Sequence, residues 1–127
     1  MVLARMLPPI HLRALAYKEN KMAVTVLDVY KKSDGSTPIA FGAWIATLPV
    51  DRQTAFAAAN QKQQAIEANL NSSGHLLSNS GLTKEWASAD AYHAVNTPDS
   101  HDPDWMAFWE EYITVNDVTF TQVVTGE

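Results

Sequence analysis

The chain of 127 residues contains no cysteine. This absence excludes disulfide bonds, thiolate zinc sites and cysteine nucleophiles, and it fits a reducing cytoplasmic location. Glycine is scarce, with five residues, and the sequence contains neither a glycine-rich phosphate loop nor a nucleophile elbow. No hydrophobic run approaches the roughly 20 residues that span a membrane, so we expect a soluble protein without a membrane partner.

Positive charge is also in short supply. The net charge is −5, and residues 1–21 carry four basic residues and one acidic residue, so the rest of the chain accounts for −8. A body this acidic repels a phosphate backbone, and the pair Lys31-Lys32 at a turn is too small to form a basic patch. We therefore expect no nucleic-acid partner.

Residues 1–21 are expected to form an N-terminal extension outside the domain. They are basic and apolar like a targeting peptide, but Pro8-Pro9 interrupts the apolar stretch and no cleavage pattern follows. Two alternatives remain open. In the first, Ile10 to Tyr17 form an additional strand or arm. In the second, the native product begins at Met22, because the codons of Lys18 to Lys21 are compatible with a ribosome-binding sequence just before a start codon.

Residues 22–127 are predicted to form a single α+β domain. Hydrophobic residues make up 46% of the chain and charged residues 18%, as in ordinary globular proteins. Strands are expected where Val, Leu, Thr or aromatic residues cluster between turn signals. They are Ala23–Lys31, two short strands or a hairpin within His75–Ala87, and Val118–Val124. Because the first of these strands is apolar on both faces, we place it in the centre of a sheet.

Periodicity and capping residues predict the main helices. The strongest is Asp51–Leu70, followed by Gly74 as a stop signal; its single stripe contains Phe56, Ala59, Gln63, Ile66 and Leu70. Ser88 begins a short helix, and Asp102 caps a helix with an aromatic stripe. That stripe contains Trp105, Phe108, Trp109, Tyr112 and Ile113.

The segment after the first strand permits two interpretations. Thr37-Pro38 resembles an N-cap followed by proline at the first helical position, which predicts a short helix through Leu48. A strand over Ile39–Ile45 is the alternative, because Gly42 weakens the helix. In a different fold, residues 37–70 would form a helical hairpin and the strands only a small sheet.

The segment Lys84-Glu85-Trp86-Ala87-Ser88-Ala89-Asp90-Ala91-Tyr92 resembles a signature of the dimeric α+β barrel superfamily, which includes antibiotic-biosynthesis-monooxygenase-like domains. In that family, a strand ends with a charged residue, Trp, any residue and Ser, and a helix carrying an aromatic residue follows. The resemblance extends over residues 82–124. It implies a ferredoxin-like antiparallel sheet with helices on one face, and a homodimer in which two such sheets face each other.

The resemblance does not extend to the haem-degrading branch of the superfamily. In that branch, the strand Trp acts with an Asn on the first strand and a His on the last helix. Trp86 matches the Trp, but the first strand offers Asp28, and the helix from Asp102 to Thr114 contains no His. Haem degradation is therefore disfavoured, and no cofactor is expected.

Four residues are candidates for a ligand pocket: Asp28, Tyr30, Trp86 and His93. A carboxylate within an apolar strand must be exposed or hydrogen-bonded. We expect Asp28 at a strand edge or in a salt bridge with a partner, with a role as general base as the alternative. Trp86 is expected in the core or in a dimer interface, with ligand stacking as the alternative.

The sequence does not identify a reaction. His75, His93 and His101 lack the spacing of metal ligands, so no metal is expected. Two classes of function remain. The first is a domain that binds a small apolar or aromatic molecule between the sheet and the helices. The alternative is a non-enzymatic structural or interaction protein, for example an accessory protein of a phage or a marine microbe.

Overall fold

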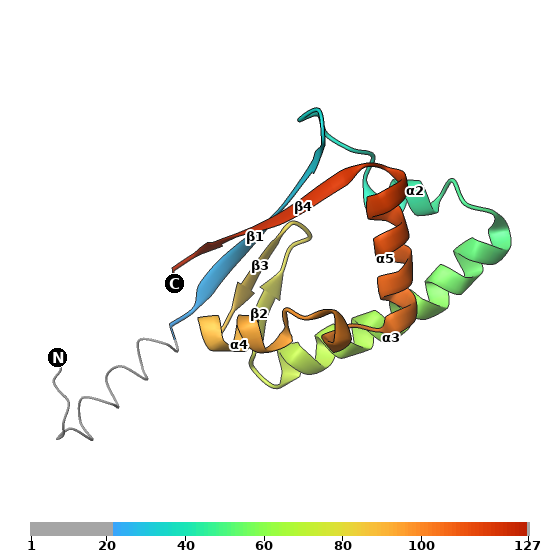
Figure 1. The fold of residues 1–127 in the computed structure, drawn as a ribbon. Helices are drawn as coiled ribbons and strands as arrows, with labels where there is room; N and C mark the ends of the chain where they lie inside the picture. Colours follow the sequence, from blue (N-terminus) through green and yellow to red (C-terminus); the bar gives the residue numbers. More distant parts are fainter. Residues whose placement is uncertain (1–21, 127) are drawn as a thin grey trace, which may run out of the picture.

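A computed structural model of the chain describes residues 22–126, so the predictions for residues 1–21 lie outside the described residues. Within this range the chain forms four strands, four α-helices and one 3-10 helix (Figure 1). Their order is β1 (Val24–Lys32), α2 (Phe41–Ile45), α3 (Val50–Ser72), β2 (Leu76–Asn79), β3 (Thr83–Trp86), α4 (Ala89–Val95), η1 (Pro98–Ser100), α5 (Pro103–Val115) and β4 (Val118–Thr125). The predicted α+β class is confirmed.

The four strands form one sheet in the order β2-β3-β1-β4, and every neighbouring pair is antiparallel. The central position predicted for β1 is confirmed, because it pairs with β3 on one side and with β4 on the other. Val24 lies opposite Trp86 in β3, and Leu27 lies opposite Val123 in β4. The alternative of a helical hairpin with a small separate sheet is therefore wrong.

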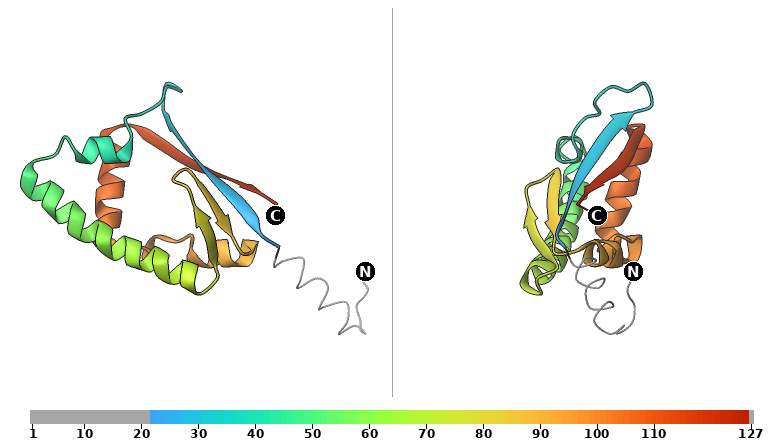
Figure 2. Two further views of the ribbon diagram at one scale, coloured as in Figure 1. Left: turned by 180° about the vertical axis from the view of Figure 1, so that it is seen from behind. Right: turned by 90° about the vertical axis from the view of Figure 1, so that its left-hand side faces the viewer.

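The helices cover one face of the sheet. Figures 1 and 2 show α2, α3 and α5 on the same side of the strands. Side chains alternate along β1, so that Val24, Val26 and Asp28 are buried under the helices while Thr25 and Leu27 point to the opposite face. The side chain of Leu27 is 41% exposed. The described residues therefore leave the outer face of the sheet uncovered.

The caps predicted at Ser88 and Asp102 are confirmed. The hydroxyl of Ser88 accepts a hydrogen bond from the backbone N–H of Ala91 at 3.0 Å at the start of α4. Asp102 likewise accepts from the backbone N–H of Trp105 at 3.0 Å at the start of α5. The helix α3 ends shortly before Gly74, whose φ of 84° is the left-handed conformation that favours glycine at this point.

The short helix α2 is present, but its predicted start was wrong. The helix begins at Phe41, and Ala40 before it is extended, with φ −65° and ψ 149°. The proline therefore precedes the helix instead of opening it. A tertiary contact explains the difference, because the hydroxyl of Tyr112 donates a hydrogen bond to the carbonyl of Ile39 at 2.5 Å and ties this extended segment to α5.

The core is divided into two hydrophobic clusters. The first contains Val24, Val26, Leu76, Trp86 and Tyr92, and the second contains Trp44, Ile45, Phe108, Tyr112 and Val118. The long helix α3 contacts the edge strand β2, while α5 contacts the opposite edge strand β4. The helices thus rest mainly on the two edges of the sheet, and the space above its centre lies between the clusters.

Candidate functional site

A cavity of about 400 Å³ lies between the helices and the inner face of the sheet. This volume is within the range of small-molecule pockets. Residues of β1, β3, β4, α3 and α5 contribute to its wall, together with the segment after α4. The aromatic side chains that line it are Tyr30, Phe41, Trp86, Tyr92, Trp105, Trp109 and Phe120. Together with aliphatic residues such as Ile66, Leu70 and Leu76, these rings make the wall largely apolar, with polar groups at particular positions.

Asp28 lies at the cavity and is buried, with 9% of its surface exposed. Its Oδ1 accepts a hydrogen bond from Nε2 of Gln122 on β4 at 3.0 Å. The expectation that Asp28 is exposed at a strand edge was wrong, because β1 is a central strand and the even-numbered residues of β1 face the helices. The hydrogen-bonded alternative is the one that the structure adopts.

Tyr30 follows Asp28 on the same face of β1 and also lines the cavity. Its ring lies 5.1 Å from the ring of Phe120 and 5.7 Å from that of Trp109. Burial raises the pKa of the Tyr30 phenol, and the charge of Asp28 raises that pKa further. The phenol is therefore neutral near pH 7 and offers a hydroxyl group rather than a phenolate.

Trp86 and His93 occupy different surroundings. Trp86 is 7% exposed and lines the cavity, and its ring packs against Tyr92 at 5.9 Å. Its indole N–H is buried and has no hydrogen-bond partner among the described residues. A bound ligand could supply the missing acceptor. His93 is not among the residues that line the cavity, and its exposed ring lies against Tyr92 at 5.0 Å.

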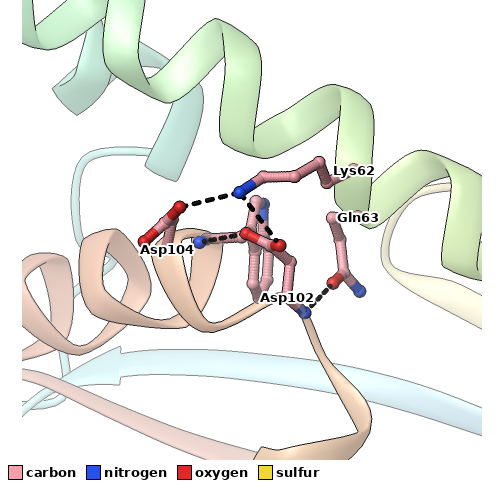
Figure 3. A network of polar contacts seen from close by, with 5 residues as sticks. Lys62, Gln63, Asp102 and Asp104 are labelled. Atoms are coloured by element: carbon pink, nitrogen blue, oxygen red, sulfur yellow. Dashed lines mark hydrogen bonds and ion pairs between the residues drawn. The ribbon is translucent and has the colours of Figure 1, made fainter.

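A polar network joins α3 to the start of α5 beside the cavity (Figure 3). Gln63 is 3% exposed, and its Oε1 accepts a hydrogen bond from the backbone N–H of Asp102 at 2.9 Å. The ammonium group of Lys62 lies 3.4 Å from Asp102 and 2.7 Å from Asp104. Because Lys62 is exposed, its ion pairs stabilise the fold little, so the buried amide is the main link.

The orientation of the Gln63 amide also fixes the protonation state of His101. Since Oε1 of Gln63 faces the N–H of Asp102, its Nε2 group donates to Nδ1 of His101, 2.9 Å away. The imidazole therefore accepts at Nδ1 and carries its proton on Nε2. Burial lowers the pKa of His101, the charge of Lys84 lowers it further, and Glu67 opposes both. His101 is thus a neutral donor on the cavity wall.

Sequence reasoning did not single out several polar residues of the cavity. Gln122 could have been found, because the alternation of β4 places it on the same face as Val118 and Phe120, toward the helices. Lys84 could have been found in the same way, because it lies two positions before Trp86 on β3. Gln63 was placed in the helical stripe on α3, where it is the one polar member, but it was not proposed as a site residue. No local pattern indicated His101, because it reaches the cavity only through the tertiary fold.

The part of the chain that the structure describes contains neither a group of metal ligands nor a helix that could span a membrane. Within residues 22–126, no group of three or more His, Asp or Glu side chains is placed to hold a metal ion. None of the helices in the same range is long and apolar enough to cross a membrane.

Comparison with protein-family models, curated proteins and solved structures found no match. The fold and the site thus define an α+β domain with a cavity between its two layers.

Proposed function

We propose that this protein binds a small, largely apolar aromatic molecule between its sheet and its helices. The cavity of about 400 Å³, with a largely apolar wall that contains seven Phe, Trp and Tyr rings, is the observation that carries the proposal. Apolar pockets with a few placed polar groups are typical of small-molecule sites. Asp28, Tyr30 and Trp86 supply such groups here. His93 does not line the cavity. A ligand would fill space that the two core clusters leave open.

A neutral aromatic probe tests this function. We expect N-phenyl-1-naphthylamine to become fluorescent on binding and to change the tryptophan emission, because Trp86, Trp105 and Trp109 line the cavity. Ile66→Trp introduces a larger side chain from α3 into the cavity and should weaken binding at least about tenfold. Gln64→Trp is the matched control, because Gln64 is exposed on the same helix and its substitution should leave the affinity unchanged.

Three results would contradict the binding function or its place in the cavity. If the wild-type protein binds no probe, the interaction or structural class becomes the better account. If Ile66→Trp binds as tightly as the wild type while its thermal melting shows a folded protein, the probe occupies another surface. Equal loss of affinity in both tryptophan variants would show an effect that is unrelated to the cavity.

The homodimer is part of the same proposal. The strand order β2-β3-β1-β4 supports a ferredoxin-like arrangement, and the outer face of the sheet offers a surface for a second copy. Leu27 and Val123 lie side by side on this face and are 41% and 50% exposed. Thr25, Thr83 and Thr121 are their neighbours on this face, and Glu85 lies opposite Thr25. An uncharged apolar centre of this kind suits an interface of twofold symmetry.

Light scattering provides the test of the dimer. We expect the wild-type protein to have twice the chain mass of 14.0 kDa. Leu27→Lys should reduce the mass to that of one chain, because the interface would bury an unpaired ammonium group. Thr119→Lys, at the far end of the same face, is the control and should remain a dimer. A wild-type monomer at high concentration would overturn this part of the proposal.

A further inference from the structure

A directed chain of hydrogen bonds ends at Asp28 on the cavity wall. Nδ2 of Asn96 donates to the hydroxyl of Tyr92 at 3.1 Å. That hydroxyl donates to Oε1 of Gln122 at 2.5 Å, and Nε2 of Gln122 donates to Oδ1 of Asp28 at 3.0 Å. Every donor points toward Asp28, so the orientation of the Gln122 amide is determined by its two neighbours.

The chain uses only one of the two carboxylate oxygens of Asp28. Within residues 22–126, no side chain or backbone group donates a hydrogen bond to Oδ2, and Asp28 forms no ion pair. The neighbouring backbone N–H of Asp28 is already bonded to the carbonyl of Leu82 at 2.8 Å. An oxygen without a donor, on a largely buried carboxylate that lines a cavity, retains capacity to accept a strong hydrogen bond from whatever occupies that cavity.

The other charged groups of the wall leave Asp28 as the available acceptor. Glu67 also lines the cavity, but its two oxygens accept from Asn79 at 3.0 Å and, more weakly, from Gln63 at 3.5 Å. Lys84 is the one cationic side chain on the wall within the described residues, and His101 is neutral, so the wall carries two carboxylates and one ammonium group. The charge of the wall therefore does not favour an anion.

We infer that the ligand is a flat aromatic molecule bearing a hydroxyl or amino group that donates a hydrogen bond to Oδ2 of Asp28, and that aromatic carboxylates are rejected. This inference rests on the proposed binding function and adds the polarity of the ligand to it. The rings of Tyr30, Trp109 and Phe120 beside Asp28 accommodate the aromatic body. A carboxylate in the same place would meet Asp28 as a like charge.

Three probes of similar shape test the polarity: naphthalene, 2-naphthol and 2-naphthoate. For the wild-type protein at neutral pH, 2-naphthol should bind at least about tenfold more tightly than naphthalene, because a hydrogen bond to a buried charged group is gained. The third probe, 2-naphthoate, should bind most weakly. Tryptophan fluorescence and calorimetry both report these affinities without a variant.

The variant Asp28→Asn should reverse the preference. Gln122 continues to donate to the new amide oxygen, because its own orientation is fixed by Tyr92. The amide nitrogen then occupies the place of Oδ2 and presents a donor to the cavity. We expect 2-naphthoate to gain at least about tenfold and 2-naphthol to lose as much. Glu85→Gln, an exposed charge on β3 that does not line the cavity, is the control and should leave the binding of 2-naphthol within about twofold of the wild type.

The outcomes separate the inference from the proposed function. If none of the probes binds to the wild-type protein, both fail. If the three probes bind to the wild type with equal affinity, the cavity is a binding site but Asp28 does not set its polarity, and the inference alone fails. Tighter binding of 2-naphthoate than of 2-naphthol to the wild type would also overturn it. A reversal between the wild type and Asp28→Asn would establish Asp28 as the group that selects the ligand.

Discussion

Tyr112→Ala is expected to lower the free energy of unfolding by about 3–5 kcal/mol, the range for removing a large buried aromatic side chain. Tyr112 is 2% exposed, and its ring contacts those of Phe41 at 5.1 Å, Trp44 at 5.8 Å and Trp109 at 5.7 Å. The substitution thus opens a void where α2, α5 and the aromatic wall of the cavity meet. A domain of this size has a total stability of roughly 5–15 kcal/mol, so the loss should be visible at once in urea denaturation.

Tyr112→Phe separates the packing of the ring from the hydrogen bond of its hydroxyl. The ring remains, and only the bond to the carbonyl of Ile39 is lost. We expect a cost of about 1 kcal/mol. If the alanine variant loses no more stability than the phenylalanine variant, the ring is not a centre of packing. The second hydrophobic cluster would then depend on other residues.

Gln63→Met is expected to lower the free energy of unfolding by about 1–3 kcal/mol. The methionine side chain has a similar length and remains buried. The stability falls because methionine cannot accept the hydrogen bond of the buried Asp102 N–H, which loses its partner at 2.9 Å. Lys62→Met, at the neighbouring position, is the matched control. Its ion pairs with Asp102 and Asp104 involve an exposed ammonium group, so we expect a change of at most about 1 kcal/mol. Equal losses in both variants would show that the buried amide has no special role.

Gln63→Glu tests the protonation state of His101 through pH. In the wild-type protein the pKa of His101 lies below its ordinary value of 6.5. The unfolded chain therefore binds the proton more readily, and this contribution to stability is present above about pH 6.5 and is lost as the pH falls through the folded pKa. A carboxylate in place of the Nε2 group would accept from a protonated Nδ1 and raise the pKa. We expect the variant to lose less stability than the wild type on acidification, as measured by urea denaturation across this range. Identical pH profiles would contradict the assigned tautomer.

The elements that local chemistry specifies were predicted well. The helical stripe of α3 and the caps formed by Ser88 and Asp102 depend on residues within a few positions of one another, so the sequence contains all of the information. The helix α2 was predicted less completely. Its own residues permitted a short helix or a strand, and the structure forms the helix. Its start depends on the bond between Tyr112 and Ile39, which are 73 positions apart.

The candidate site was predictable only in part. Asp28, Tyr30 and Trp86 were named from the sequence because polar and aromatic residues stand out in apolar strands, and all three line the cavity. Their surroundings could not be inferred. Asp28 and its partner Gln122 are separated by 94 positions, and nothing in either segment specifies that β4 pairs with β1.

The sequence by itself determined the class of the fold and the position of most helices and strands, because turn signals, caps and periodicity act over one or two turns of chain. The tertiary structure decided the strand order, the burial of Asp28 and the neutral state of His101. It also decided that the cavity exists, because α3 and α5 rest on opposite edges of the sheet. These properties arise from contacts between distant segments, and the free energy of such contacts depends on the whole packed arrangement.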